Sequence, residues 1–482
     1  MPKANQGWVD AEFQFVRLPD ETLGVYNLWD TEATARLAHC LHRELVQTGQ
    51  LSWFQEGPQA VQPAVLAMQR RGLLLDQSAH DTSRARLHDE LHETDRSLRA
   101  HTPPGISFDS PTQLSKWLFN PPTEGGLGLK PAKITDKGHR QVDLESLVRV
   151  LQGLRKRDAA ARPILEQLFH RSRLKTLLER YFDPMVGHDG RVRATVKMFG
   201  TKTFRFSYAR PALQQFPDKL RRMFIASPGH HFVSSDYSQL EARIMAVLAQ
   251  DRVSLDAFTR GEDIHDLNSR DLFGWSPSDW EALNPTQRKA ARNFAKTFLY
   301  GLQYGGRAET MKMKVFCPCP LCVEENPPTL DLKRSEIALA ERRWMARHPA
   351  VPRYQRQVSE QVRSTRSYLH PLGVRRYFAK PWGNELEREV KNVPMQMGAA
   401  ILMVQAQVKL HQLGVPVCLQ HHDSFLCEVP DEQIAETSTT LREVMEAPVP
   451  QMGGVRFPVT ISVGRNWADR TIDNPEGLGA ST

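Results

Sequence analysis

The arrangement of apolar and polar positions divides the chain into helical and strand-rich segments. A helical pattern, TEATARLAHCLHREL, lies within residues 1–60, and residues 61–185 are mostly helical and charge-rich, with turns at PPG and PPTEGG. From about residue 186 basic and apolar residues alternate in strand fashion, whereas residues 255–370 return to a helical pattern. Residues 394–413 predict a long amphipathic helix. The pattern therefore predicts a strand-rich core interrupted by a long helical insertion.

A tight β-hairpin is predicted around LQHHDSFLCEV, residues 419–429. Apolar residues alternate on both sides of its centre, as in a half-buried strand pair; they are Val415, Val417, Leu419, Phe425, Cys427 and Val429. Asp423 lies at the tip, where a carboxylate needs a positively charged partner. Glu428 is expected at the surface because of its position along the second strand.

A second acidic residue ends another predicted strand, in HFVSSDYSQLEARIMAVL. The strand stops at Asp236, and the spacing of Ser238 and Glu241 predicts a capping box at the start of a helix. An acidic residue at a strand end is usually just solvated. If Asp236 and Asp423 meet, however, they offer the carboxylate oxygens that hard cations prefer. Two Mg²⁺ ions, or Mn²⁺ in their place, would then stabilise the attacking and leaving oxygens of a phosphoryl transfer.

A third feature is the helical segment QRKAARNFAKTFLYGLQYGG, residues 287–306. Arg292, Lys296, Tyr300 and Tyr304 follow one another at intervals of four residues and so form one stripe on a helix. The order of two cations and then two aromatic rings matches a nucleotide, with phosphates at one end and a base and sugar at the other. The alternative is a basic amphipathic helix packed on a core, which would be preferred without the two aspartates.

These segments resemble the motifs of family A DNA polymerases, the bacterial DNA polymerase I and phage enzymes. DYSQLEAR, RNFAKTFLYGLQYG and HHDSF resemble motifs A, B and C in order and spacing. FDSPTQLSKWLF resembles the thumb signature, TKTFRFSYARPALQQFP the duplex-binding segment, EDIHDLNSRDLFG the entry to the fingers, and KNVPMQMGAA the segment before the last hairpin. The resemblance implies an α+β, multidomain right-hand fold with an antiparallel-sheet palm, helical fingers and a helical thumb.

The resemblance also implies a division of the chain. The expected parts are an exonuclease remnant of C-terminal helices (1–55), the thumb with the start of the palm (56–185), the first part of the palm (186–254), the fingers (255–379, with a Cys-rich insert at 316–328) and the second part of the palm (380–482). Tyr26 and Asp30 have the Y-x-x-x-D spacing of the family's proofreading exonuclease, and DAE at residues 10–12 mimics its D-x-E element. Too few residues separate them for the intervening sheet, so no proofreading is expected on this chain.

By resemblance, the catalytic residues are Asp236, Asp423 and Lys296. The two aspartates and the Tyr237 main-chain carbonyl would bind the metal ions, and Lys296 would be the general acid for the departing pyrophosphate. The residues implied in dNTP binding are Arg292, Lys296, Tyr300, Tyr304, His265, Glu241 and Gln239. Glu241 and Tyr304 would form the barrier to a 2′-hydroxyl, and Tyr300 implies tolerance of dideoxynucleotides.

Further residues match positions that contact primer–template DNA. Hydrogen-bond donors of this kind suit the minor groove, where all correct base pairs offer acceptors at similar places. The residues are Arg205, Gln214, Arg388, Asn392, Gln396, His422 and Lys175. Lys175, together with Lys202, is expected at phosphates; for either lysine, a solvated position is the alternative.

Two features depart from the family's pattern. Ser424 follows the motif C aspartate where relatives commonly have Glu, which predicts activity with altered metal or primer handling. Cys317, Cys319 and Cys322 form a C-x-C-x-x-C loop. Zinc takes four ligands and no histidine is adjacent, so unpaired thiols are favoured and a Zn²⁺ site completed from elsewhere is the alternative.

Composition adds little beyond these motifs. The net charge of +8 over 482 residues suits a polyanionic partner without proving one. Six cysteines are too few for a disulfide scaffold. No signal-peptide pattern and no apolar run of about 18 residues is present, which predicts a cytoplasmic protein (in the host cytoplasm if the source is viral) without a membrane partner.

The sequence therefore predicts a template-directed DNA polymerase that adds dNTPs to a primer 3′ end. Its expected partners are primer–template DNA and dNTPs, with a separate exonuclease or processivity chain as a further partner. One alternative is a single-subunit RNA polymerase of related fold, which Glu241 argues against because a bulky acid would lie beneath the 2′ carbon. The other is an inactive DNA-binding relative, for which Ser424 is the only hint.

Overall fold

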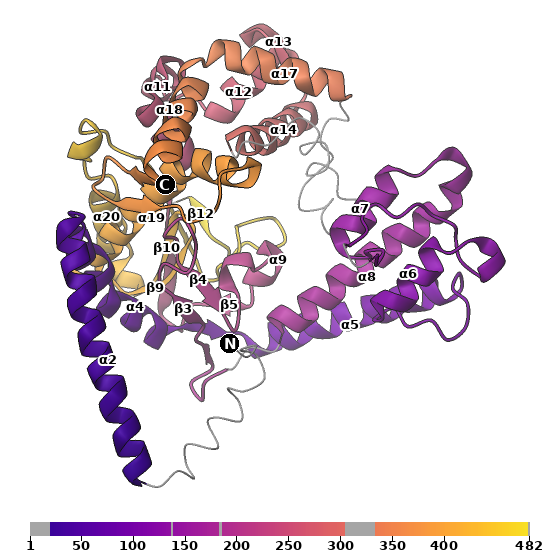
Figure 1. Cartoon of the computed structure of the whole chain (residues 1–482), viewed down its shortest axis with the longest axis horizontal. Helices are drawn as coiled ribbons and strands as arrows, with labels where there is room; N and C mark the ends of the chain where they lie inside the picture. The colour runs from indigo at the N-terminus through magenta and orange to yellow at the C-terminus, as the bar shows by residue number, and fades with distance from the viewer. Residues whose placement is uncertain (1–19, 136–137, 183–185, 304–332, 481–482) are drawn as a thin grey trace.

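The structure, a computed structural model, describes residues 20–135, 138–182, 186–303 and 333–480. A central β-sheet lies between two helical lobes, one formed by α5 to α8 and the other by α11 to α18 (Figure 1). The predicted α+β class is confirmed. No helix among these residues is both long enough and apolar enough to cross a bilayer.

The central sheet has five strands in the order β12-β11-β6-β10-β9, and every neighbouring pair is antiparallel. The strands are β6 (His230–Tyr237), β9 (Val417–His421), β10 (Ser424–Pro430), β11 (Val459–Gly464) and β12 (Gly479–Ala480). The predicted hairpin is thus confirmed as β9 and β10. Phe232 and Val233 of β6 and Phe425 of β10 are fully buried, so the middle of the sheet lies in the core.

Four helices pack on the sheet or on one another beside it. They are α4 (Ala60–Arg71), α10 (Leu240–Ala249), α19 (Asn384–Gln412) and α20 (Ile434–Met445). Of these, α4 and α20 contact the strands of the sheet, α19 packs on α4 and α20, and α10 packs on α19. The long amphipathic helix predicted from residue 394 is confirmed, but α19 begins earlier, at Asn384, and carries Pro394 inside. Burial of most of its C-terminal half, from Met395 to Leu410, explains why tertiary packing holds the helix together despite the proline.

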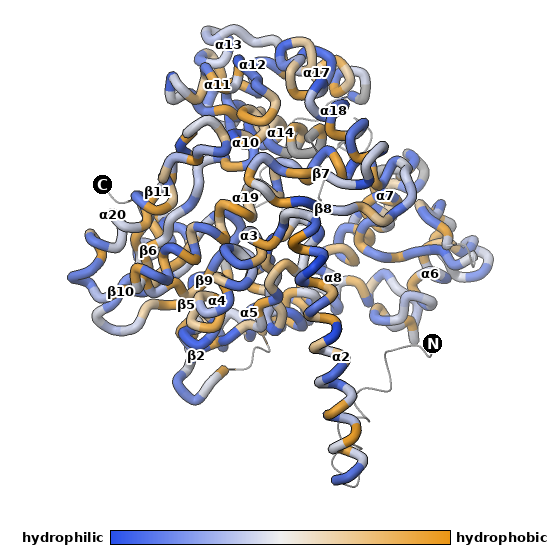
Figure 2. The backbone as a smooth tube through the Cα atoms, turned by 60° about the vertical axis from the view of Figure 1, so that its left-hand side comes forward, coloured by the Kyte–Doolittle hydropathy of each residue, from blue (hydrophilic) through white to orange (hydrophobic). Residues whose placement is uncertain are grey.

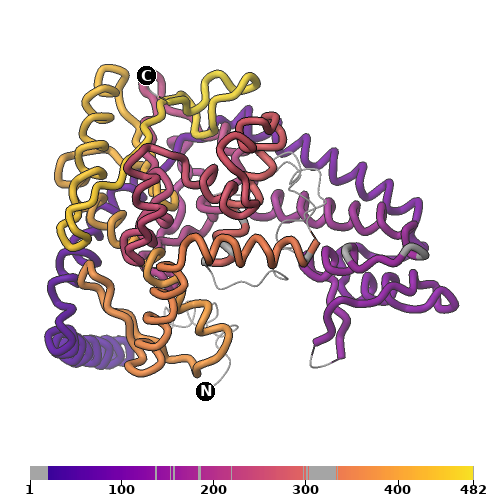
Figure 3. The backbone as a smooth tube through the Cα atoms, turned by 90° about the horizontal axis from the view of Figure 1, so that it is seen from above, coloured from indigo at the N-terminus to yellow at the C-terminus, as the bar shows by residue number. Residues whose placement is uncertain are grey.

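The first helical lobe has a core of its own. It consists of α5 (Gln77–Arg99), α6 (Pro111–Phe119), α7 (Leu144–Gln152) and α8 (Arg162–Tyr181). Leu98, Trp117 and Leu118 are almost fully buried together there. Seen from above, α5 and α8 run side by side away from the sheet (Figure 3). The Asp76 carboxylate accepts a 3.0 Å hydrogen bond from the Ala79 N–H and so caps α5.

The second helical lobe follows α10. It contains α11 (Arg252–Thr259), α12 (Ile264–Phe273), α13 (Pro277–Ala282), α14 (Pro285–Gln303), α17 (Arg334–Arg347) and α18 (Ala350–Thr365). His348 is fully buried and bridges Asp251 at 2.8 Å and Asp271 at 3.1 Å. Burial alone would lower the pKa of His348, but the hydrogen bonds to the two carboxylates outweigh it and raise this pKa. His348 thus ties the loop at Asp251 to α12 and to the end of α17.

Three small sheets complete the structure. The first joins β1 (Leu73–Leu75), β2 (Arg191–Val192) and β5 (Phe224–Ile225), the second β3 (Thr195–Lys197) and β4 (Ser207–Ala209), and the third β7 (Ser367–Leu369) and β8 (Arg375–Tyr377). Residues 186–225 are therefore strand-rich, as predicted. The strands are short, however, because turns interrupt the alternating pattern.

The N-terminal helix α2 (Asp20–Gln47) projects from the body and buries none of its residues (Figure 2). Tyr26 and Asp30 both lie exposed on this helix. The interpretation of residues 1–55 as an exonuclease remnant stays a prediction, and the DAE element at 10–12 lies outside the described residues.

Two local predictions are wrong. Ser238 does not cap α10: the helix starts at Leu240, its N-cap residue Gln239 is left-handed with φ 57°, and no side chain caps it. Glu241 instead forms an ion pair with Arg205. Glu428 is not a surface residue, because its side chain is 8% exposed and forms an ion pair with Arg191. In both cases the glutamate pairs with an arginine far away in the sequence, which the local pattern of residues could not predict.

Candidate active site

The two aspartates meet at one end of the central sheet. In the β6–β10 register Asp236 is opposite Ser424, the residue after Asp423. The Tyr237 main-chain N–H donates a 3.1 Å hydrogen bond to the Asp423 carbonyl oxygen. Neighbouring strands lie about 4.8 Å apart, so the two residues are adjacent although far apart in sequence. The sequence pattern predicted both strand ends, and the structure brings them together.

Asp236 is costly to ionise, because protein atoms displace water around it and because Asp423 is a neighbouring negative charge. The pKa of Asp236 is raised to about 7, first by desolvation among the surrounding protein atoms and then by the charge of Asp423, while Lys296 opposes the shift. The side chain of Asp236 is nevertheless reachable by solvent. Like charges this close favour a shared proton or a cation between them. A divalent cation would replace the proton and remove the repulsion.

Arg205 connects the acidic pair to a third carboxylate. Its guanidinium donates a 3.3 Å hydrogen bond to Asp423 and also forms an ion pair with Glu241, which is 6% exposed. Arg205 precedes β4 and was predicted only as a DNA-binding residue. No sequence pattern linked it to Glu241, because the two residues come from separate parts of the fold.

The predicted nucleotide helix exists as α14, and Arg292 of its cationic stripe contacts the start of α12. Arg292 forms ion pairs with Asp263 at 2.9 Å and Asp266 at 2.7 Å. Burial lowers the pKa of His265 to about 4, with smaller effects of Asp263, which opposes it, and of Lys296 and Arg292. His265 is therefore neutral at neutral pH, and its Nδ1 is buried without a partner in the described part of the chain.

The charge of Lys296, on α14, acts on the acidic pair. Lys296 is exposed, and its charge lowers the pKa values of both Asp236 and His265. One lysine thus lies within electrostatic reach of a catalytic-site carboxylate and of α12. Only the backbone of Tyr300 is described on α14, and Tyr304 lies outside the described residues, as do Cys317, Cys319 and Cys322.

Two predicted DNA-binding residues lie next to the hairpin turn. His422 occupies the turn with φ 53°. Burial lowers its pKa, and a hydrogen bond with the main chain of Gln214 opposes this shift. Beside them is a cluster that sequence analysis missed: Arg221 lies 4.8 Å from the ring of Trp467 and 3.3 Å from His421 Nε2. In the sequence, only the presence of a second histidine, His421, directly before His422 pointed to it.

The other predicted DNA-binding residues come from α19, from α8 and from the segment before β4. Arg388, Asn392 and Gln396 share one stripe of α19, and the Asn392 side-chain oxygen is buried without a partner among the residues described. Lys175 is on α8 in the first helical lobe, where it pairs with Asp109 at 2.7 Å. Lys202 pairs with Glu389 at 2.9 Å. The structure therefore spreads these residues over three regions.

The carboxylates of Asp236 and Asp423 suit a hard divalent cation that takes only a few of its ligands from the protein. Within residues 20–135, 138–182, 186–303 and 333–480, no group of three or more His, Cys, Asp or Glu side chains could hold a metal. Mg²⁺ commonly uses one or two carboxylates and takes its other ligands from water and substrate phosphates. The pair formed by Asp236 and Asp423 fits that requirement, whereas a dedicated cage of side chains is absent from the described part of the site.

Comparisons with known proteins agree with this geometry. The family model described as DNA polymerase family A matches residues 77–469. A thermostable DNA polymerase I of Thermus thermophilus is 29% identical over 467 residues, covering 91% of this chain and 52% of that protein. The DNA polymerase I of Treponema pallidum is 27% identical over 477 residues, covering 94% of this chain and 44% of that protein. The chain thus spans about half the length of the curated relatives it matches.

A solved structure shares the fold. It is the POL domain of Pol1 from M. smegmatis in complex with DNA primer-template and dNTP, with a TM-score of 0.74 and 24% identity over 90% of this chain and 74% of that one. The predicted right-hand fold, with an antiparallel-sheet palm and helical fingers and thumb, is therefore confirmed. Because the family model covers most of its length, the chain belongs to DNA polymerase family A.

Proposed function

We propose that the protein is a template-directed DNA polymerase that adds dNTPs to the 3′ end of a primer. The observation that carries the proposal is the meeting of Asp236 and Asp423 across β6 and β10, within reach of the Lys296 charge. Family membership supports it, as do relatives named DNA polymerase I. The structural neighbour, a complex with primer-template and dNTP, supports both substrates.

Asp236, Asp423 and the Tyr237 main-chain carbonyl would hold two Mg²⁺ ions, with Mn²⁺ as a substitute. Bound there, the ions supply Lewis-acid stabilisation of the attacking and leaving oxygens. The residues fit such a group because desolvation and the Asp423 charge raise the pKa of Asp236 more than Lys296 lowers it, so a cation would relieve the cost of ionising this carboxylate. The protein's part is to keep the two acids on adjacent strands, with the turn at His422 fixing Asp423.

On the nucleotide side, Lys296 would contact the triphosphate and give a proton to the departing pyrophosphate. Its position suits this role because growing negative charge there draws the ammonium proton. Neutral His265 can donate a hydrogen bond to a phosphate oxygen. Arg292 would reach the phosphates only by loosening its ion pairs with Asp263 and Asp266, which otherwise fix α14 on α12. Tyr300, Tyr304 and Gln239 would complete the nucleotide site.

Glu241 would exclude ribonucleotides. Its buried carboxylate, held by Arg205, occupies fixed space beside Asp423. A fixed acid can reject a 2′-hydroxyl by occupying its position, and Tyr304 would form the other side of the barrier. This acid disfavours the alternative of an RNA polymerase.

The primer–template would contact residues from three regions of the fold. Arg205, Gln214 and His422 would act around the hairpin turn, Arg388, Asn392 and Gln396 from the α19 stripe, and Lys175 would meet phosphates from the first helical lobe. The matching domain division is thumb within 56–185, palm at 186–254 and 380–482, and fingers at 255–379. A separate exonuclease or processivity chain and a cytoplasmic location are further parts of the proposal. For Cys317, Cys319 and Cys322 we propose unpaired thiols, with a Zn²⁺ site completed from elsewhere as the alternative.

Primer extension tests the proposal. Purified protein, a primer–template and Mg²⁺ are combined with either dNTPs or rNTPs. Extension with dNTPs and little with rNTPs is expected. Extension with rNTPs only would favour the RNA polymerase. No extension with either would favour the inactive DNA-binding relative, and Ser424→Glu would then show whether the missing acid is the cause.

A further inference from the structure

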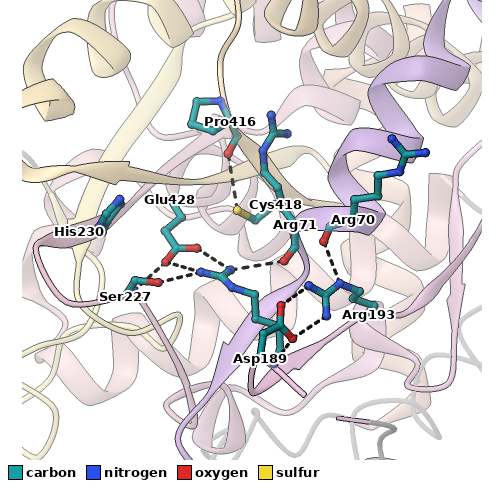
Figure 4. A pocket seen from close by; sticks show the side chains of 10 residues that line it. Arg70, Arg71, Asp189, Arg193, Ser227, His230, Pro416, Cys418 and Glu428 are labelled. Atoms are coloured by element: carbon teal, nitrogen blue, oxygen red, sulfur yellow. Dashed lines mark hydrogen bonds and ion pairs between the residues drawn. The ribbon is translucent and has the colours of Figure 1, made fainter. Parts of the chain in front are cut away.

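A second charged pocket lies at the other end of the hairpin that carries Asp423. It has a volume of ≈ 340 Å³, and its walls come from the end of α4, the segment around β2, the start of β6, and the far ends of β9 and β10 (Figure 4). Cys418 lines it and lies five residues before Asp423 on the hairpin, which corresponds to about 16 Å along a strand. The pocket is therefore separate from the candidate active site.

The pocket carries an excess of positive charge. Four arginines line it (Arg70, Arg71, Arg191 and Arg193), against two carboxylates (Asp189 and Glu428). Counting each guanidinium as +1 and each carboxylate as −1 gives 4 − 2 = +2. A concentration of guanidinium groups around a concave site is an arrangement that binds oxyanions, because the planar fork of N–H donors matches carboxylate and phosphate geometry.

Two of the arginines are already used by the protein itself. Arg191 donates to both oxygens of Glu428, at 2.8 and 3.0 Å, and to the Ser227 hydroxyl at 2.8 Å. Arg193 makes a two-point contact with Asp189 and donates from Nε to the Arg70 carbonyl at 2.8 Å. These ion pairs build and stiffen the walls.

The other two arginines supply the unused donors. Arg71 donates one hydrogen bond, from Nη1 to the Val417 carbonyl at 3.1 Å, which leaves four of its N–H groups for another acceptor. Arg70 is exposed, and no hydrogen bond of its side chain occurs among the described residues. Figure 4 shows the two side chains leaving the same helix end in different directions, so the exposed Arg70 side chain has to turn towards Arg71 for both to hold one ligand. The excess charge of +2 thus resides on Arg70 and Arg71.

The other lining residues argue against a reactive cysteine and against a cation site in this pocket. Cys418 is buried, its thiol lies 3.6 Å from the Pro416 carbonyl, and burial raises its pKa to about 12, so it stays a neutral thiol. Both carboxylates are engaged by arginines, so a cation finds no available ligand set among the described residues that line the pocket. What remains is a small, positively charged recess with unused N–H donors, in which His230 offers one ring acceptor, Nε2, because its Nδ1 faces the Pro228 carbonyl.

We infer that this pocket is a binding site for a phosphate-class oxyanion, held by the guanidinium groups of Arg70 and Arg71. The same chemistry is offered by free inorganic phosphate and by the backbone phosphates of single-stranded DNA. The doubly charged form of inorganic phosphate matches the excess charge. A backbone phosphate would place a DNA strand on the side of the sheet away from the primer terminus.

Calorimetric titration with sodium phosphate, at an ionic strength held constant with NaCl, tests the inference. The variants are Arg70→Gln/Arg71→Gln and, as a matched control, Arg442→Gln, which removes an exposed arginine of α20 that does not line the pocket. Phosphate affinity is expected to fall at least about fivefold in the double variant and to be unchanged in the control. Arg70→Gln alone keeps the Arg71 contact to Val417 and should lower phosphate affinity by a smaller factor. If the double variant does not fold, this single variant is the test. Equal phosphate affinity in wild type and the pocket variants overturns the inference.

A second titration distinguishes the two sources of phosphate. The probe is a 12-nucleotide oligothymidylate. Binding weakened by the pocket variants, together with weaker phosphate binding, assigns the pocket to single-stranded DNA. Oligothymidylate binding that does not change while phosphate binding falls assigns it to a free anion. Primer extension rates should stay within about twofold of wild type in both cases, because the pocket is remote from Asp423.

Discussion

Arg205 donates a hydrogen bond to Asp423 across 3.3 Å while it forms an ion pair with the buried Glu241. One arginine therefore supplies positive charge to a carboxylate that we assign to metal binding. Binding of DNA and binding of the metal ions would therefore involve the same side chains, Arg205 and Asp423. In the proposed site, Arg205 would compete with the metal for Asp423 as well as contact DNA.

Removing Arg205 should strengthen metal binding and weaken DNA binding. Both partners in the Arg205–Asp423 contact are about one-fifth exposed, so the contact is worth only about 0.5–1 kcal/mol, or about two- to fivefold in Mn²⁺ affinity. Mn²⁺ titration of Arg205→Ala without DNA should show that increase. Lys202→Ala is the control, because Lys202 pairs with Glu389. Weaker Mn²⁺ binding in Arg205→Ala would mean that the arginine organises the metal site.

Replacing Glu241 should relax sugar selectivity. Glu241→Ala opens the space beneath the sugar, and the ratio of dNTP to rNTP incorporation efficiency should fall by about 10²-fold or more. Glu241→Gln keeps the size and loses the charge, so it should retain most of the selectivity. If Glu241→Ala leaves the ratio unchanged, the acid serves only to hold Arg205.

Replacing Lys296 should slow the chemical step. Lys296→Met removes a phosphate contact and a proton donor, and single-turnover incorporation should slow by about 10²–10⁴-fold. Lys289→Met, two turns earlier on α14 and about 10 Å away, is the matched control and should change little. Equal small effects of both substitutions would exclude a direct role for Lys296.

The raised pKa of Asp236 gives a pH-dependent stability. A carboxyl whose pKa is about 7 in the folded state and 3.8 otherwise binds its proton more tightly when folded, so stability is lost as pH rises from about 4 to about 7. Asp236→Asn removes this loss. With a chelator present its Tm should exceed that of wild type by about 1–2 °C more at pH 8 than at pH 5, after discounting for solvent screening. A Tm difference between the variant and wild type that does not grow with pH would contradict the raised pKa of Asp236.

The sequence was sufficient for the elements that carry the site. Strict alternation around Asp423 predicted the hairpin, an apolar run predicted the strand ending near Asp236, and the four-residue spacing of Arg292 and Lys296 predicted α14. These succeeded because local periodicity determines which face of an element is buried. Their meeting in space followed from resemblance to a family and not from periodicity.

Long-range ion pairs could not be predicted in this way. Glu241 had the spacing of a capping box, but its carboxylate is drawn to Arg205, and the chain enters α10 through the left-handed Gln239. Glu428 looked like a surface residue, but Arg191 holds it in the wall of the second pocket. Each interaction joins residues from different elements, so neighbouring sequence carries no trace of it.

The most direct test of the central claim is the single-turnover rate of dNTP incorporation with Mg²⁺ for Asp236→Asn, Asp423→Asn and the double variant, with Ser424→Ala as the control on the same hairpin. If the two aspartates act as one metal-binding unit, each single variant should lose at least about 10³-fold, and the double variant should be scarcely slower than either. Ser424→Ala should stay within about tenfold of wild type. Retention of near wild-type rates by either aspartate variant would contradict the account.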